Sequence, residues 1–225
     1  MRAARSFRPR RRGLSAGRAA EFERGAATYV VPTHGDPIDL SALFPGHDDV
    51  VLDIGFGGGE ALVELAAQRP TEAVLGVEVH TPGVARVVAA AEVNGWSQVR
   101  VVATDVLEVL PRLAPASLAG IRVWFPDPWL KQRQRHRRLV RGDVLPVLVD
   151  RLRPGGVLHV ATDIADYAAQ VLRVAADEPR LRGGVVPRPA WRPVTRFERR
   201  GLDAGRTVTD LWFERVAPSD DATVV

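Results

Sequence analysis

Acidic residues stand at regular points along this chain, at or just past the ends of short apolar runs. Asp53, Glu78 and Asp105 belong to three successive runs, and Asp127 follows a fourth. Carboxylates can attract a cationic ligand or accept hydrogen bonds from hydroxyl groups. The spacing therefore suggests one binding edge that collects acids from several elements.

The elements that must position these acids alternate along the sequence. Apolar runs rich in β-branched residues are each followed by a segment of helical character. Because the runs are continuously apolar, they predict parallel strands buried on both faces. We expect an α/β fold with a doubly wound, mostly parallel sheet of Rossmann-like type. The expected strands are 50–54, 73–79, 99–104, 121–125 and 157–162, and the expected helices are 60–68, 83–94, 143–152 and 163–176.

The C-terminal part breaks this alternation. The segments PVTRFERRG (193–201) and RTVTDLWFERV (206–216) read as two extended stretches joined across LDAG, with no helix between them. We expect them to pair antiparallel at the edge of the sheet. By fold analogy, such a pair is more common in methyltransferases that use S-adenosylmethionine than in dinucleotide dehydrogenases.

The first turn, LDIGFGGGE, contains Asp53, Gly55 and Gly57. Glycines let the backbone approach a ligand at the carboxyl ends of the strands. A dinucleotide fingerprint would require glycine at position 60, where this chain has Glu60. An acid just before the turn suits the cationic groups of S-adenosylmethionine, whereas it would repel a pyrophosphate. The sequence therefore favours S-adenosylmethionine as the cofactor.

Two later acids complete the expected cofactor pocket. Glu78 could accept hydrogen bonds from both ribose hydroxyls in a bidentate contact. Asp105 could accept from the adenine amino group or cap the next helix, and both roles remain open. The strand 121–125 brings Asp127 to the same edge, next to where a methyl donor would lie. Beside it, Trp124, Phe125 and Trp129 are flat aromatic surfaces, and we expect the first two to be core residues.

Composition bounds the rest of the prediction. The chain carries a net charge of +4, with two acid-free basic blocks at residues 1–12 and 130–142, which suggest a nucleic-acid partner. It has no cysteine, which excludes disulfides and cysteine nucleophiles.

We expect a basic, flexible arm over 1–30, a methyltransferase domain over 31–217 and a flexible tail over 218–225. No apolar stretch is long enough to span a membrane, and we expect a cytoplasmic protein without a metal; monomer and homodimer both stay open.

The segment FPDPWLKQRQRHRRL (125–139) resembles the signature of the bacterial tRNA (guanine-N7)-methyltransferases, which modify guanine 46 in the tRNA variable loop. The likeness extends from about residue 50 to 215, with the motifs in the same order. It implies that Asp53, Glu78, Asp105 and Asp127 contact S-adenosylmethionine, and that Asp127 is the catalytic residue. It also implies substrate contacts by Lys131, Asp163, Thr195, Arg196, Phe197 and Glu198. It assigns a tRNA-contacting track to Arg133, Gln134, Arg135, His136, Arg137 and Arg138.

The chain departs from that family at three positions. Asp53 and Arg196 stand where Glu and Lys are frequent, and both changes preserve charge. Arg206 stands where His is usual, which leaves the role of this position open.

The chemistry of guanine N7 agrees with this resemblance. N7 has an in-plane lone pair and can attack a sulfonium methyl group without losing a proton, so catalysis reduces to alignment and electrostatics. Asp127 could stabilise the developing positive charge or hold the guanine N1 and N2 hydrogens, and we prefer both roles to general base. Asp163 and Glu198 are candidates for the same base-edge recognition, with a helix cap and a surface acid as their structural alternatives.

Two other functions compete with this one. The first is a methyltransferase that acts on an exocyclic amine of another nucleic acid or of a protein. Those enzymes commonly have Asn or Asp followed by two prolines and an aromatic residue, whereas this chain alternates Pro126, Asp127, Pro128 and Trp129. The second is a tRNA-binding protein or chaperone that kept the fold without the reaction.

Overall fold

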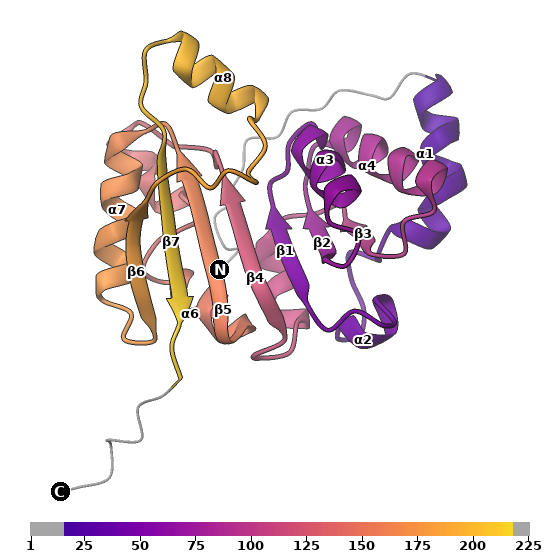
Figure 1. Ribbon diagram of the computed structural model, residues 1–225, viewed down its shortest axis with the longest axis horizontal. Helices are drawn as coiled ribbons and strands as arrows, with labels where there is room; N and C mark the ends of the chain where they lie inside the picture. The colour runs from indigo at the N-terminus through magenta and orange to yellow at the C-terminus, as the bar shows by residue number, and fades with distance from the viewer. Residues whose placement is uncertain (1–15, 218–225) are drawn as a thin grey trace, which may run out of the picture.

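A computed structural model describes residues 16–217 of the 225-residue chain. One sheet of seven strands has the order β3-β2-β1-β4-β5-β7-β6 (Figure 1). The strands β1 to β5 run parallel, whereas β7 is antiparallel to both of its neighbours, β5 and β6. The strands are β1 (Val50–Ile54), β2 (Ala73–Val77), β3 (Val99–Val102), β4 (Leu118–Trp124), β5 (Leu152–Thr162), β6 (Leu181–Val186) and β7 (Thr209–Arg215).

Helices cover both faces of this sheet, as the continuous apolar strands predict. Val74 of β2 packs with α1, α3 and α4 in one cluster, while its neighbour Leu75 packs with α6 and α7 in another. Adjacent strand residues point to opposite faces, so the two clusters are the two sides of the sheet. The helices are α1 (Ala16–Tyr29), α2 (Leu40–Leu43), α3 (Glu60–Gln68), α4 (Thr81–Asn94), α5 (Val106–Val109), α6 (Leu145–Arg151), α7 (Ala165–Ala176) and α8 (Arg196–Asp203), with 3-10 turns η1 (Leu110–Arg112) and η2 (Gln132–Arg137).

The strand order confirms the predicted doubly wound fold and fixes where a ligand binds. The order reverses at β1, which pairs with β2 on one side and with β4 on the other. In open α/β sheets, ligands bind outside the carboxyl ends of the strands at this switch point. The loops that follow β1 and β4, which carry Gly55 and Asp127, are therefore neighbours at that edge.

The prediction for residues 193–201 is wrong. These residues do not form a strand, because Thr195 caps the helix α8, with its side chain accepting a hydrogen bond from the backbone N–H of Glu198 at 3.0 Å. The antiparallel pair exists, but β7 pairs with β6, which lies before α8 in the sequence. The antiparallel pair of β7 and β6 lies at the edge of the sheet, as predicted, with β6 as the outermost strand.

The boundary expected for the basic arm also needs correction. Residues 16–29 form α1, which packs against α4 and buries Tyr29 in the cluster on that face. The second half of the expected arm is thus part of the packed structure. Residues 1–15 and the expected tail 218–225 lie outside the described residues. In the part of the chain between Ala16 and Ala217, none of the helices has the length and apolar character that crossing a membrane requires.

Candidate cofactor and guanine site

The glycine-rich turn after β1 adopts a backbone that side chains disfavour. Gly55, Gly57 and Gly59 have φ values of 73°, 60° and 82°, in the left-handed region that glycine enters without strain. Gly83, near the start of α4, packs directly against this turn, where a Cβ atom would collide with the carbonyl oxygen of Gly57. α4 therefore packs directly against the glycine-rich turn, and it can come this close to the turn only because residue 83 has no side chain.

Glu78 ties the end of β2 to the same turn. Its Oε2 accepts a hydrogen bond from the N–H of Gly57 at 2.6 Å, and its Oε1 accepts from the N–H groups of Val79 and His80 at 2.5 and 2.7 Å. A carboxylate offers about four acceptor positions, so three are used. One acceptor position is left, on Oε2, whereas the bidentate ribose contact expected from the sequence would need one on each oxygen. Burial raises the pKa of Glu78, and the three N–H groups oppose that rise.

Asp53 lies inside the sheet, in register with Gly76 of β2 and Arg122 of β4. Its side chain is buried, with 3% of the residue exposed. Burial raises the pKa of Asp53 to about 6, and the nearby Arg122 guanidinium opposes the rise. The turn therefore begins beside a carboxyl group whose ionised form lacks solvation and would gain from a cationic ligand.

Asp105 has the helix-capping role that the sequence left open. It follows β3 and precedes α5, and its Oδ1 accepts a hydrogen bond from the N–H of Leu107 at 3.1 Å. This contact satisfies one of the first N–H groups of the helix. The carboxyl group still lies at the carboxyl end of β3, next to Glu78 at the end of β2.

Asp127 lies in a tightly constrained loop after β4. Phe125 and Trp129 on either side of it have φ values of 52° and 43°, which non-glycine residues rarely adopt. The N–H of Phe125 donates to the carbonyl of Ala161 at 2.7 Å, which pins the loop to the end of β5. Strain of this kind persists where the surrounding structure holds a side chain in a set position, and it clusters at functional sites.

The aromatic residues around Asp127 belong mostly to the interior. Trp124 is buried, as expected, and Phe125 packs against the same small cluster. Trp129 is also buried, and the guanidinium of Arg137 lies 3.7 Å from the centre of its ring. Trp129 is therefore covered by an arginine and does not offer an open face for base stacking.

The expected tRNA track over 133–138 divides into exposed and structural residues. Arg138 is 0% exposed, and its guanidinium donates to the carbonyl of Pro128, to Gln170 and to Asp166 at 2.6–2.8 Å. Arg138 holds the loop after β4 against α7, and its side chain does not reach the surface where an RNA contact was expected. Arg135 pairs with the same Asp166 at 3.1 Å. Within 133–138, Arg133 and His136 are exposed, and Gln134, Arg135 and Arg137 are half-buried. Lys131, just before this stretch, is also exposed.

The start of α8 lies over the glycine-rich turn. A ring carbon of Phe197 would lie 3.3 Å from a Cβ atom placed on Gly57, although these residues are 140 positions apart in sequence. Thr195 caps the helix, and Arg196 and Phe197 are exposed. The structure therefore brings three of the four predicted substrate residues of this segment to the edge where the cofactor residues gather.

Glu198, the fourth, is turned inward. It is 2% exposed, and Arg192 donates to its two oxygens at 2.7 and 2.8 Å, while Arg188 donates to Oε1 at 3.0 Å. Glu198 is neither the surface acid nor the open base-edge acceptor that the sequence allowed. Its carboxylate instead anchors α8 to the segment before it.

Asp163, directly after β5, lies against Gly201 of α8. A Cβ atom on Gly201 would lie 2.8 Å from its Oδ2, and Arg206 donates to the same oxygen at 2.7 Å. Asp163 does not cap α7, whose N-cap residue is Ile164. The unusual arginine at position 206 therefore pairs with a predicted substrate-binding acid.

A buried polar chain links the end of β4 to α8, and sequence reasoning missed it. Trp124 donates from Nε1 to Nδ1 of His159 at 3.1 Å, so the neutral ring carries its proton on Nε2, 2.8 Å from Asp210. Arg192 donates to Asp210 at 3.1 Å and to Glu198. Burial lowers the pKa of His159, which agrees with a neutral ring. This Trp124–Glu198 network consists of Trp124, His159, Asp210, Arg192 and Glu198.

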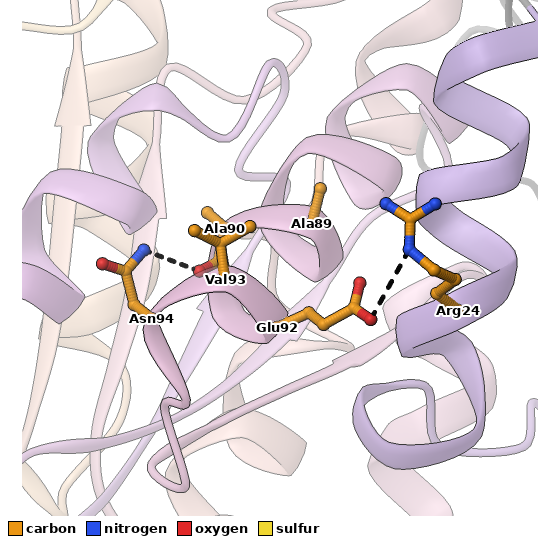
Figure 2. Close-up of a pocket in the computed structure, with 6 residues that line it drawn as sticks. All are labelled: Arg24, Ala89, Ala90, Glu92, Val93 and Asn94. Atoms are coloured by element: carbon orange, nitrogen blue, oxygen red, sulfur yellow. Dashed lines mark hydrogen bonds and ion pairs between the residues drawn. The ribbon is translucent and has the colours of Figure 1, made fainter.

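A surface pocket between α1 and α4 is lined by none of the expected site residues. Figure 2 shows it between α1 and the C-terminal half of α4, with Arg24 paired to Glu92 at 3.8 Å and Asn94 donating to Ala90 at 2.8 Å. The opposite end of α4 is the one that meets the glycine-rich turn. The pocket is lined by Arg24, Ala89, Ala90, Glu92, Val93 and Asn94.

Comparison with known proteins agrees with this geometry. The methyltransferase family model Methyltransf_4 matches residues 47–211. The tRNA (guanine-N(7)-)-methyltransferase of Streptomyces avermitilis is 44% identical over 96% of this chain and 77% of its own length. The Thiobacillus denitrificans protein of the same name is 44% identical over 94% and 95%. The crystal structure of the 16S rRNA methyltransferase KamB shares the fold, with a TM-score of 0.60 and 20% identity over 82% of this chain and 96% of its own. The chain belongs to the tRNA (guanine-N7)-methyltransferase family.

Proposed function

We propose that this protein transfers the methyl group of S-adenosylmethionine to N7 of guanine 46 in the variable loop of tRNA, and that it does so in the cytoplasm. One observation supports the site: Phe197 of α8 lies over Gly57 of the turn after β1, and Asp163 lies against Gly201 of the same helix. The expected cofactor residues and the expected guanine residues therefore border one space.

The residues at the turn fit S-adenosylmethionine. Gly55, Gly57 and Gly59 form a backbone cradle that a Cβ atom would strain. Asp53 and Glu78 are buried carboxyl groups, suited to a cationic and hydroxyl-bearing ligand and unsuited to a pyrophosphate. S-adenosylmethionine, when bound, supplies an electrophilic methyl group on a sulfonium centre. In our proposal Asp53 attracts the cationic end, and Glu78 accepts one ribose hydroxyl.

The protein's task in the chemical step is alignment and charge stabilisation. Guanine N7 attacks with its lone pair, so no proton must leave and no general base is required. The purine ring gains positive charge as the carbon–nitrogen bond forms. We propose that Asp127, fixed between Phe125 and Trp129, stabilises this charge, since a preorganised carboxylate acts most strongly where water is excluded. Thr195, Arg196, Asp163 and Lys131 are the proposed contacts to the tRNA substrate.

The experiment that tests this function uses two tRNA transcripts that differ at position 46. The protein is incubated with S-adenosylmethionine carrying a labelled methyl group and with tRNA that has either guanine or adenine at that position. We expect 7-methylguanosine from the first transcript and none from the second. A labelled exocyclic amine, or equal labelling of both transcripts, would contradict the proposal; tRNA binding without any methyl transfer would support a non-catalytic binding protein.

A further inference from the structure

We propose that the exposed face of α8 is a second contact surface for the tRNA backbone, formed by Arg196, Arg199 and Arg200. This inference rests on the proposed tRNA substrate and adds to it a surface that lies apart from the basic track of η2. The partner chemistry is the phosphate of the sugar-phosphate backbone, which arginine binds with two parallel hydrogen bonds.

The three arginines share one side of the helix. Their spacing of i, i+3 and i+4 places them next to each other on an α-helix. All three are exposed, whereas Glu198 and Gly201 form the buried side of the same helix. In the described residues 16–217, none of these three guanidinium groups forms an ion pair with an acid, although Arg196 lies near enough to Glu60 to lower the pKa of that carboxyl group. α8 therefore presents three exposed cations that form no ion pair within the described part of the protein.

Glu198, the one acid in the first turn of α8, points into the protein and away from the face that carries the three arginines. Glu198 would place a negative charge among the arginines if it pointed outward. Instead, Arg192 and Arg188 take its carboxylate into the interior, and Asp210 and His159 continue the contact to β4. The remaining acid of the helix, Asp203, is its last residue and lies one turn beyond Arg199 and Arg200, so it offsets part of their charge. The Trp124–Glu198 network thus fixes the orientation of α8, and the exposed face keeps three arginines against one acid.

The location of α8 agrees with a backbone contact beside the reacting guanine. Phe197 lies at Gly57 of the turn, and Gly201 lies at Asp163, so α8 borders the carboxyl ends of β1 and β5. Figure 1 shows α8 above this end of the sheet. The other basic segment, η2, borders the same place from a different side, because Arg135 pairs with Asp166 just after Asp163. Two cationic segments therefore flank residues 163–166.

Two arginines of the basic stretch 133–138 are engaged by contacts within the protein, which favours a second contact surface. Arg138 is buried, and Arg135 is paired with Asp166. Nucleic-acid affinity comes largely from the number of phosphates that Lys and Arg neutralise, so a track with fewer available cations binds weakly alone. The face of α8 supplies three more beside the carboxyl ends of β1 and β5.

The test is the salt dependence of tRNA binding by Arg199→Gln/Arg200→Gln. Glutamine keeps the helix propensity while it removes both charges. The control is Arg153→Gln/Arg182→Gln, which removes two arginines at the opposite end of the sheet, near the start of β5 and β6; Arg182 is exposed, and Arg153 is half-buried and paired with Asp49. Unlabelled tRNA is titrated into each full-length variant at 50, 100 and 200 mM salt, and thermal unfolding checks that each variant is folded.

We expect the α8 variant to bind tRNA roughly 10-fold more weakly at low salt, with the slope of log affinity against log salt reduced by about 1.5, since each lost phosphate contact removes roughly 0.7–0.9. The control should keep the wild-type slope, and Arg199→Lys/Arg200→Lys should retain most of the binding. A wild-type slope in the α8 variant, or an equal change in the control, overturns the inference. Formation of 7-methylguanosine by the wild-type protein tests the proposed function separately.

Discussion

Arg192 and Glu198 form a buried pair in which the guanidinium donates to both carboxylate oxygens, at 2.7 and 2.8 Å. The two residues are 1% and 2% exposed. Buried ion pairs contribute little net stability relative to apolar residues. The main role of this pair is therefore to fix the position of α8 relative to the segment before it. It sets where α8 begins, and α8 carries Thr195, Arg196 and Phe197 to the site.

Replacement of Arg192 by lysine should lower methyl transfer more than it lowers stability. Lysine keeps the charge but cannot donate in parallel to both oxygens of Glu198 and also reach Asp210. We expect kcat to fall about 10–100-fold, because a small displacement of substrate-positioning groups is costly to the chemical step. The control is Arg180→Lys, which alters a similar two-oxygen pair with Glu178 at the far end of the sheet. Arg192→Lys should lose more Tm than Arg180→Lys, because Arg192 is buried whereas the Arg180 side chain is 32% exposed. A similar loss of kcat in both variants would refute the positioning role.

Gly83→Ala should weaken S-adenosylmethionine binding. In an ordinary helix this change is stabilising by roughly 0.5–1 kcal/mol. Here the added methyl group would collide with the backbone carbonyl of Gly57, which cannot move without shifting the turn. We expect a lower Tm and at least about a 10-fold weaker affinity for the cofactor by calorimetry. Gly17→Ala in α1, where nothing lies within 4 Å, is the control and should bind normally.

The affinity for S-adenosylmethionine should rise between pH 5 and pH 7. The pKa of Asp53 is raised to about 6, so its carboxyl group is neutral at pH 5 and ionised at pH 7. The ligand's ammonium group keeps its charge over this range, because α-amino groups titrate at about 7.7–8.0. Calorimetry at pH 5, 6 and 7 should show weaker binding by Asp53→Asn at pH 7 and a smaller pH dependence. Identical pH profiles for the two proteins would contradict a role of Asp53 in attracting the cation.

Ionisation of Asp53 should lower the free energy of unfolding of the ligand-free protein. The pKa of Asp53 in the folded protein lies above the unfolded value of 3.8, so the folded state holds the proton more tightly. Stability therefore falls as the pH rises from about 4 to 6, and the cost is fully present above pH 6. We expect ligand-free Asp53→Asn to have a higher Tm than the wild type at pH 7, and a smaller advantage at pH 4. A lower Tm at pH 7 would show that ionised Asp53 is stabilised by Arg122 more than burial penalises it.

Alanine substitutions of Arg138 and Arg133 should distinguish a structural arginine from an RNA-contacting arginine within the same basic stretch. Arg138→Ala removes three hydrogen bonds from a fully buried site, and we expect about 2–3 kcal/mol of lost stability, because Asp166 is half exposed and regains water. Arg133→Ala removes an exposed cation and should leave Tm unchanged while it reduces the salt dependence of tRNA binding. Urea unfolding and tRNA titrations measure the two effects. The assignment fails if Arg138→Ala keeps its stability and loses the salt dependence.

The sequence predicted the first half of the fold closely, because local signals there agree with the tertiary structure. The expected strand 50–54 and helix 60–68 match β1 and α3 residue for residue. The extended interpretation of 193–201 overlooked a helix-start signal, since Thr195 followed by Glu198 is a capping pattern. The strand β6 was missed because its two central residues, Gly183 and Gly184, are poor strand formers.

The candidate site likewise contains residues whose position could be predicted from the sequence and residues whose position could not. Residues next to strand ends, such as Glu78 and Asp127, were predictable because parallel strands bring their carboxyl ends to one edge. The Trp124–Glu198 network was not predictable, since His159 and Asp210 are 51 positions apart and meet through the pairing of β5 with β7. Likewise, the burial of Arg138 depends on α7, which comes 28 positions later at Asp166.

The central claim is that Asp127 acts in methyl transfer rather than in tRNA binding. Its most direct test is the single-turnover rate of methyl transfer to tRNA by Asp127→Ala, measured beside the Kd for the same tRNA. We expect the rate to fall by about 10²–10³-fold, the usual effect of removing a preorganised electrostatic group, while the Kd stays within a few-fold of the wild type. A rate near that of the wild type, or a loss of binding as large as the loss of rate, would contradict the account.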